Sequence, residues 1–199
     1  MSFTTKFKPI VIALFAVAIV SFGYYKINQA EDNASIICDQ QYALCTSATC
    51  IPDPNDSNKA TCFCKVEQGK SFGQTSCKAR RPYTDSKGVS FVTSTYSFAE
   101  YATKKAMFCP SSSPWSYCLD KSCTIDPKDP TKAICVCDVY RTGEFLTLGG
   151  NCDTSTCDTA YWSGASYSDT SAAMAQLAKA LGLAKAPENY CPNTPPPAK

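Results

Sequence analysis

The sequence predicts a small, disulfide-rich α+β fold built as two tandem repeats. A block of four cysteines occurs twice, at an offset of 73 residues, with identical spacing inside each block. Each block is followed by a β-prone run and then by a helical pattern. Each repeat is therefore expected to hold a stapled loop and hairpin, then a strand and a helix. The recurring cysteines are Cys45, Cys50, Cys62 and Cys64, matched by Cys118, Cys123, Cys135 and Cys137.

The cysteine count indicates how such small domains are stabilised. Fourteen cysteines in 199 residues allow up to seven disulfides, each contributing about 2 to 4 kcal/mol. Domains of this size bury little core, so the bonds supply stability that packing lacks. Disulfides require an oxidising compartment. The predicted disulfide cysteines are Cys38, Cys45, Cys50, Cys62, Cys64, Cys77, Cys109, Cys118, Cys123, Cys135, Cys137, Cys152, Cys157 and Cys191.

The N-terminus has the pattern of an export signal. Lys6 and Lys8 precede an apolar run from Ile10 to Val20, the length of a signal-peptide core. Small residues favour cleavage after Gly23, so residues 1–23 are the predicted signal peptide.

The alternative for this segment is an uncleaved membrane anchor. Residues 9–25 would form about 25 Å of helix, just enough to span a bilayer. In both cases the cysteines lie outside the cytosol. Residues 24–37 are then a linker into the first repeat.

The first repeat is predicted at 38–110. In a strand, side chains two residues apart share a face, so Cys62 and Cys64 would each bond a different partner. A strand is therefore expected at 61–66, after a turn-rich loop. A second strand is expected at 89–96. A helix should begin at Ser97, where Glu100 completes a capping-box pattern.

The second repeat is predicted at 111–192. It holds a strand at 134–140 and a helix that runs from Ser168 or Asp169 to Gly182. The β-prone runs of the two repeats align at an offset of 71 residues. The proline-rich tail at 193–199 is expected to be extended.

Cysteine pairing cannot be fixed from spacing. Both repeats end on aromatic-Cys-Pro, at Cys109 and Cys191. Grouping the cysteines by these endings leaves Cys38 and Cys157, and predicts a bond between them that ties the repeats together. Starting each repeat one cysteine earlier leaves Cys157 and Cys191 instead. Fifteen connectivities remain possible among the six cysteines of each repeat.

The composition excludes several kinds of chemistry. The chain has no histidine, which removes Ser-His and Cys-His catalysis and histidine metal sites. A zinc ion bound by Cys45, Cys50, Cys62 and Cys64 is an alternative, but export favours disulfides. No metal and no cofactor are predicted.

Two further groups of charged residues have ordinary interpretations. The aspartate pairs could hold calcium or act as an acid pair, but their neighbouring prolines and asparagines favour turn capping. The only tight basic cluster is predicted to be a solvated loop, and nucleic acid is not an expected partner. These residues are Asp53, Asp56, Asp126 and Asp129, and Lys78, Arg80 and Arg81.

These features favour an exported, non-enzymatic structural or binding protein of the cell envelope, periplasm or extracellular space. We expect a protein partner, such as the other subunits of an envelope assembly, and contact with the membrane only through the N-terminal segment. One alternative is an inhibitor of extracellular proteases, which would present the stapled loops at 51–61 and 124–134. A second alternative is a hydrolase that uses the paired aspartates.

Overall fold

A computed structural model describes residues 35–46, 48–100, 104–109, 114–148, 161–187 and 189–192. Within these ranges, no helix is long and apolar enough to cross a membrane. The predicted signal peptide or anchor lies outside them, as do most of the linker, the tail, Cys152 and Cys157.

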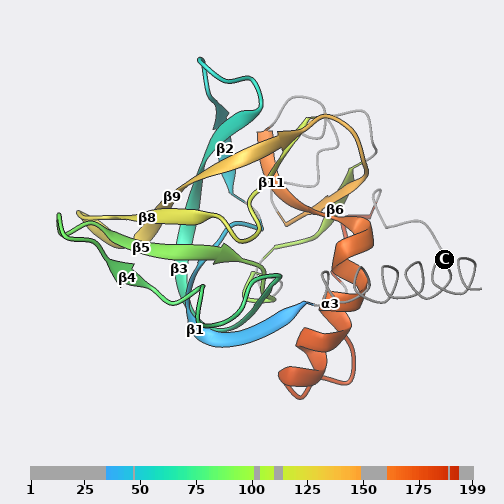
Figure 1. Cartoon of the computed structure of the whole chain (residues 1–199). Coiled ribbons are helices and arrows are strands. Elements are labelled where there is room, and N and C mark those ends of the chain that lie inside the picture. Colours follow the sequence, from blue (N-terminus) through green and yellow to red (C-terminus); the bar gives the residue numbers. More distant parts are fainter. Residues whose placement is uncertain are drawn as a thin grey trace, which may run out of the picture. The chain divides into compact units, whose positions relative to one another are not determined.

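The described residues form eleven strands in one hydrogen-bonded network, with one helix beside it (Figure 1). The strands are β1 (Ile36–Leu44), β2 (Thr49–Pro52), β3 (Lys59–Gly73), β4 (Tyr83–Thr84), β5 (Ser90–Thr95), β6 (Met107–Cys109), β7 (Trp115–Tyr117), β8 (Ser122–Asp126), β9 (Asp129–Tyr140), β10 (Phe145–Thr147) and β11 (Tyr161–Ser166). The helix is α3 (Tyr167–Ala180).

The predicted α+β class is wrong, because the structure is mostly strand and its described helix follows only the second block. The helix expected from Ser97 is replaced by a turn at its described start. There the Ser97 hydroxyl accepts a hydrogen bond from the Tyr42 hydroxyl (2.7 Å). The Glu100 carboxylate accepts one from the Thr46 hydroxyl (3.2 Å). Both polar groups therefore bind distant strands, and Met107 already belongs to β6.

The strand pairings close into two five-stranded rings. The first ring runs β3, β1, β5, β8, β9 and back to β3. The second runs β9, β7, β11, β2, β3 and back to β9. They share the β3–β9 pair. Because β5 of the first block pairs with β8 of the second, and β11 with β2, the blocks interlock rather than fold side by side.

The shared β3–β9 ladder is symmetric about the directly opposed pair Cys62 and Cys135. It ends with Lys59 opposite Asp138 on one side and with Lys65 opposite Lys132 on the other. The predicted strands at 61–66 and 134–140 are confirmed as parts of these two strands.

Four disulfides fill the space behind this ladder. Their eight cysteines are at most 7% exposed. They pack with small side chains such as Ala43, Ala60, Val92 and Ala133, so the centre of the fold is largely sulfur and methyl groups. The bonds are Cys45–Cys64, Cys50–Cys62, Cys118–Cys137 and Cys123–Cys135.

The fifth described disulfide corrects a sequence prediction. Cys38 is bonded to Cys77, so the expected bond from Cys38 to Cys157 is wrong. The β1–β3 pairing extends as far as Ile36 opposite Gly73, which brings the two cysteines together within the first block. Cys109 and Cys191 are also disulfide-bonded.

Two buried serines set the register between the blocks. The Ser94 hydroxyl donates to the carbonyl of Cys118, and the Ser163 hydroxyl donates to the carbonyl of Cys45. These equivalent contacts relate β5 to β11 at an offset of 69 residues. The predicted offset of 71 is therefore two residues out of register, because apolar resemblance along the runs could not show which hydroxyl is buried.

The C-terminal helix packs on one end of the sheet. Ala173 and Leu177 of α3 join a buried cluster with Phe72 and Tyr96. The helix ends before Gly182, whose φ of 72° is readily adopted by glycine. The predicted helix to Gly182 is confirmed.

Candidate binding surface

The outer side of the shared ladder carries apolar residues because its inner side carries the cysteines. Side chains alternate along a strand, so Phe63, between Cys62 and Cys64, faces outward. By the same alternation, Ile134 and Val136 face outward on β9 and flank Cys135. Phe63 lies directly opposite Ile134.

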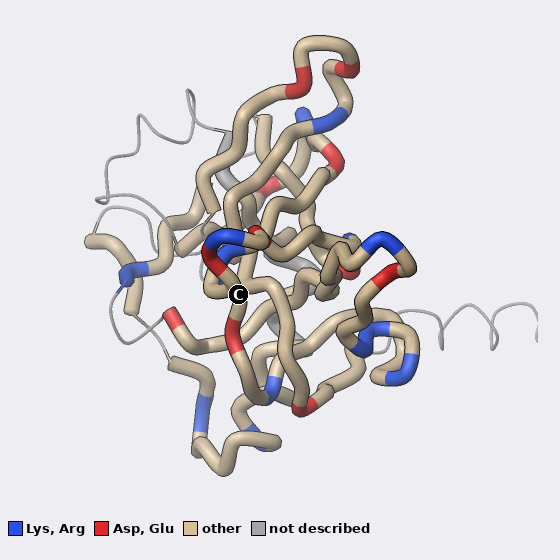
Figure 2. The backbone as a smooth tube through the Cα atoms, turned by 90° about the vertical axis from the view of Figure 1, so that its left-hand side faces the viewer, with Lys and Arg blue, Asp and Glu red and all other residues tan. Residues whose placement is uncertain are grey.

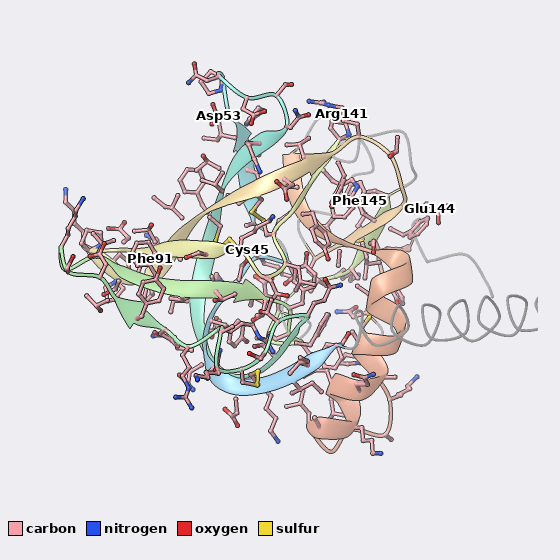
Figure 3. All side chains as sticks on the ribbon, viewed as in Figure 1. Cys45, Asp53, Phe91, Arg141, Glu144 and Phe145 are labelled. Atoms are coloured by element: carbon pink, nitrogen blue, oxygen red, sulfur yellow. A yellow bond between two sulfur atoms is a disulfide. The ribbon has the colours of Figure 1, made fainter. Side chains whose placement is uncertain are left out.

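A continuous row crosses five strands from this pair. Directly opposed residues share a face of a sheet, and each member of the row opposes the next. The Tyr83 ring stacks on Phe91 with centroids 4.9 Å apart and planes 14° apart, and Figure 3 shows Phe91 on this part of the sheet. The row is Phe63, Ile134, Thr124, Phe91 and Tyr83, on β3, β9, β8, β5 and β4.

A shorter row lies beside it, with Val136 opposite Thr61 and Thr61 opposite Ile51. We call the apolar members of both rows the apolar face: Ile51, Phe63, Tyr83, Phe91, Ile134 and Val136. Phe91 is half-buried. The others are 43–57% exposed. Exposed apolar patches of this kind mark interaction sites on soluble proteins.

Charged pairs border the apolar face. Asp138 accepts from both Lys59 and Lys121, and these hydrogen bonds lower the pKa of its carboxyl group. Lys132 pairs with Asp129 (2.8 Å). Figure 2 shows that charges are scattered along the whole backbone rather than gathered on one side. The apolar face is therefore an uncharged area with a polar border.

The aspartate pairs cap turns, as the favoured interpretation predicts. Each carboxylate accepts the backbone N–H two residues later: Asp53 from Asn55, Asp56 from Asn58, Asp126 from Lys128, and Asp129 from Thr131. Hydrogen bonds from Lys132 and Thr131 lower the pKa of Asp129 to about 2. A carboxyl group this acidic is ionised at neutral pH and cannot serve as a general acid.

The candidate protease-inhibitor loops are both hairpins. The loop at 51–61 connects β2 to β3, and its base is held by the Cys50–Cys62 disulfide. Figure 3 shows Asp53 near its protruding tip. The loop at 124–134 is mostly paired strand, since β8 and β9 are separated by two residues.

The candidate zinc ligands are in disulfides. Cys45 is bonded to Cys64, and Cys50 to Cys62. Two groups of three buried sulfurs lie close enough together to share a metal ion, Cys45 with Cys123 and Cys135, and Cys62 with Cys118 and Cys137. Every one of these sulfurs is already in a disulfide, so none offers the thiolate that zinc requires.

The structure places one residue of the basic cluster in the core. Arg80 is 1% exposed, so the predicted solvated loop is wrong at this position. Its Nη2 donates to the Ile36 carbonyl (2.6 Å) and lies 2.6 Å from the Cys38 sulfur. Its Nε lies 4.0 Å from the Asp120 carboxylate. Burial lowers the pKa of Arg80, and Asp120 opposes that shift.

Sequence reasoning missed the apolar face, although the necessary signal was present. Once the Cys-x-Cys sulfurs are placed inward, the residue between them must point outward, and it is Phe63 in one block and Val136 in the other. Comparisons of the chain with protein-family models, curated proteins and solved structures found no match.

Proposed function

We propose that this chain is an exported, non-enzymatic binding or structural protein, which joins a protein assembly of the cell envelope or extracellular space through its apolar face. Multiple disulfides indicate an extracytosolic environment. In this proposal, residues 1–23 direct export, and residues 9–25 anchor any molecules that remain uncleaved.

The apolar face is the observation that carries this proposal. An uncharged centre with a border of ion pairs has the composition of a protein interface, with an apolar core and a polar rim. The partner is therefore expected to be a protein with an apolar surface of its own.

The sulfur core supports the same proposal through rigidity. Phe63 and Ile134 lie on strands whose opposite side is stapled by four disulfides. A surface that is already held in its bound shape loses little conformational entropy on binding. The disulfides therefore both stabilise the fold and preorganise the face.

The test is cross-linking and affinity isolation of the tagged protein from its native host, with mass spectrometry of the captured proteins. The variant Phe63→Lys/Ile134→Lys places two charges on the apolar face. Leu181→Lys is the matched control, since Leu181 is 41% exposed and lies outside the face. We expect wild type and control to capture the same partner and the double variant to lose it. Equal capture by all three proteins, each verified as folded, would refute the proposal.

Protease inhibition is a second candidate, favoured by the protruding, disulfide-held hairpin at 51–61. Such a hairpin could enter an active site without losing its shape. The purified protein would be incubated with a panel of serine, cysteine, aspartic and metalloproteases. Inhibition at micromolar concentration that is lost when Ile51 is changed to Asp would support this candidate, and no inhibition of any class would exclude it.

A further inference from the structure

An apolar groove lies between α3 and the chain that follows it. Its volume is about 610 Å³, within the usual range for small-molecule sites. Leu146 of β10 belongs to its lining and is 6% exposed. The remaining lining residues are Thr170, Met174, Ala175, Ala178, Lys179, Leu183, Ala184, Lys185, Ala186 and Tyr190.

Both walls of the groove are held in place. The α3 wall is fixed by Leu177, which is fully buried in the cluster beneath the helix. The other wall is fixed at Ala106, whose N–H donates to the Asn189 carbonyl (2.7 Å) and whose carbonyl accepts from the Cys191 N–H (2.9 Å). Cys191 is itself disulfide-bonded. The groove therefore exists before any ligand arrives.

The chemistry of the lining selects the kind of ligand. Leu146, Met174 and Leu183 offer hydrocarbon, and most of the other lining residues are alanines. The two charged lining residues are Lys179 and Lys185, both exposed, and no lining residue is acidic. The groove is thus apolar along its walls and positively charged at its edge.

We infer that this groove binds a single-chain amphiphile with a carboxylate head, that is, a long-chain fatty acid. The hydrocarbon chain lies against Met174 and Leu183, and the carboxylate lies near Lys179. A polar metabolite would need several directed hydrogen-bonding groups, whereas the Thr170 hydroxyl already donates to the Ser166 carbonyl (3.0 Å). This site uses none of the residues of the apolar face.

Calorimetric titration of the full-length protein with dodecanoate, below the concentration at which micelles form, tests the inference. We expect saturable binding at one site. Butanoate, which lacks the chain, and dodecyltrimethylammonium, which reverses the head charge, should each bind at least tenfold more weakly. If either one binds as tightly as dodecanoate, or if dodecanoate does not bind, the inference is wrong.

Two matched variants locate the ligand. Leu183→Asp places a charge in the groove, whereas Leu181→Asp places the same charge two residues away on a side chain that does not line it. Both leucines are more than 40% exposed, so the fold should tolerate each change. We expect Leu183→Asp to weaken dodecanoate binding at least tenfold and Leu181→Asp to leave it unchanged.

A charge reversal makes the test independent of the folding of Leu183→Asp. Lys179→Glu should weaken dodecanoate binding about fivefold, because the loss of an exposed ion pair is modest and a repulsion replaces it. Lys65→Glu, on the sheet, is its control and should have no effect. Unchanged binding by Lys179→Glu together with Leu183→Asp would overturn the proposed site.

Discussion

The sulfur of Cys45 lies 3.4 Å from the sulfur of Cys135, although each is already bonded to another cysteine. One belongs to the first block of the sequence and the other to the second. The disulfides of each block are therefore packed against those of the other, and the two blocks share one core. Loss of a disulfide in one block should be felt in the other.

The first prediction concerns this shared packing. Replacing both members of Cys45–Cys64 by alanine should cost about 3 kcal/mol of unfolding free energy, as should the same change at Cys123–Cys135. Because the two bonds touch, removing both should depart from additivity by more than about 0.5 kcal/mol. Denaturant unfolding of the single-bond and double-bond variants measures this coupling.

The Cys38–Cys77 disulfide is the control for that cycle. It lies outside the buried cluster of eight cysteines, so its removal should be additive with removal of Cys123–Cys135. Additivity in both cycles, to within about 0.3 kcal/mol, would contradict a shared sulfur core.

The second prediction concerns Arg80. Arg80→Met should destabilise the protein by about 3 to 5 kcal/mol, because the Asp120 carboxylate and the Ile36 carbonyl lose a buried cation. Arg81→Met, at an exposed neighbour, should change stability by less than about 0.5 kcal/mol. Urea unfolding of the two variants compares them directly, and similar losses would show that Arg80 is not specifically required.

The third prediction concerns Gly73, which lies against the same ion pair. A β-carbon at position 73 would overlap the Asp120 carboxylate and the Arg80 guanidinium, so Gly73→Ala should destabilise the protein. The loss should be smaller in the Arg80→Met background, where the guanidinium is absent. Thermal unfolding of the four proteins of this cycle tests the overlap, and an equal loss in both backgrounds would argue against it.

The fourth prediction is a pH dependence at Asp138. Hydrogen bonds from Lys121 and Lys59 lower the pKa of its carboxyl group. Its contribution, about 1 kcal/mol, is therefore present above the ordinary carboxyl pKa of about 4 and is lost as the pH falls through the lowered value. The stability difference between wild type and Asp138→Asn should shrink in that acidic range, and Asp39→Asn should show no such change. A difference that persists unchanged into strong acid would contradict this role.

Local patterns in the sequence predict several elements of this fold well. The Cys-x-Cys pairs place Cys62, Cys64, Cys135 and Cys137 on the inner faces of two strands, because side-chain alternation leaves no other arrangement. The stripe that includes Leu177 predicts α3, and Gly182 marks its end. These signals lie within one element and need no knowledge of its neighbours.

The failures all concern partners that are distant in sequence. A capping-box pattern at Ser97 and Glu100 predicts a helix, but both side chains are used by Tyr42 and Thr46 on another element. Arg80 looks solvent-exposed in sequence because its partner Asp120 is forty residues away. The exchange of strands between blocks, which closes both rings, leaves no local mark, since β5 would pair as readily within its own block.

The measurement that tests this account most directly is a disulfide map of the purified, non-reduced protein by proteolysis and mass spectrometry. The account predicts peptides linked through Cys38–Cys77, Cys45–Cys64, Cys50–Cys62, Cys118–Cys137 and Cys123–Cys135. Free thiols at the central cysteines, or a native bond between Cys45 and Cys135, would contradict it.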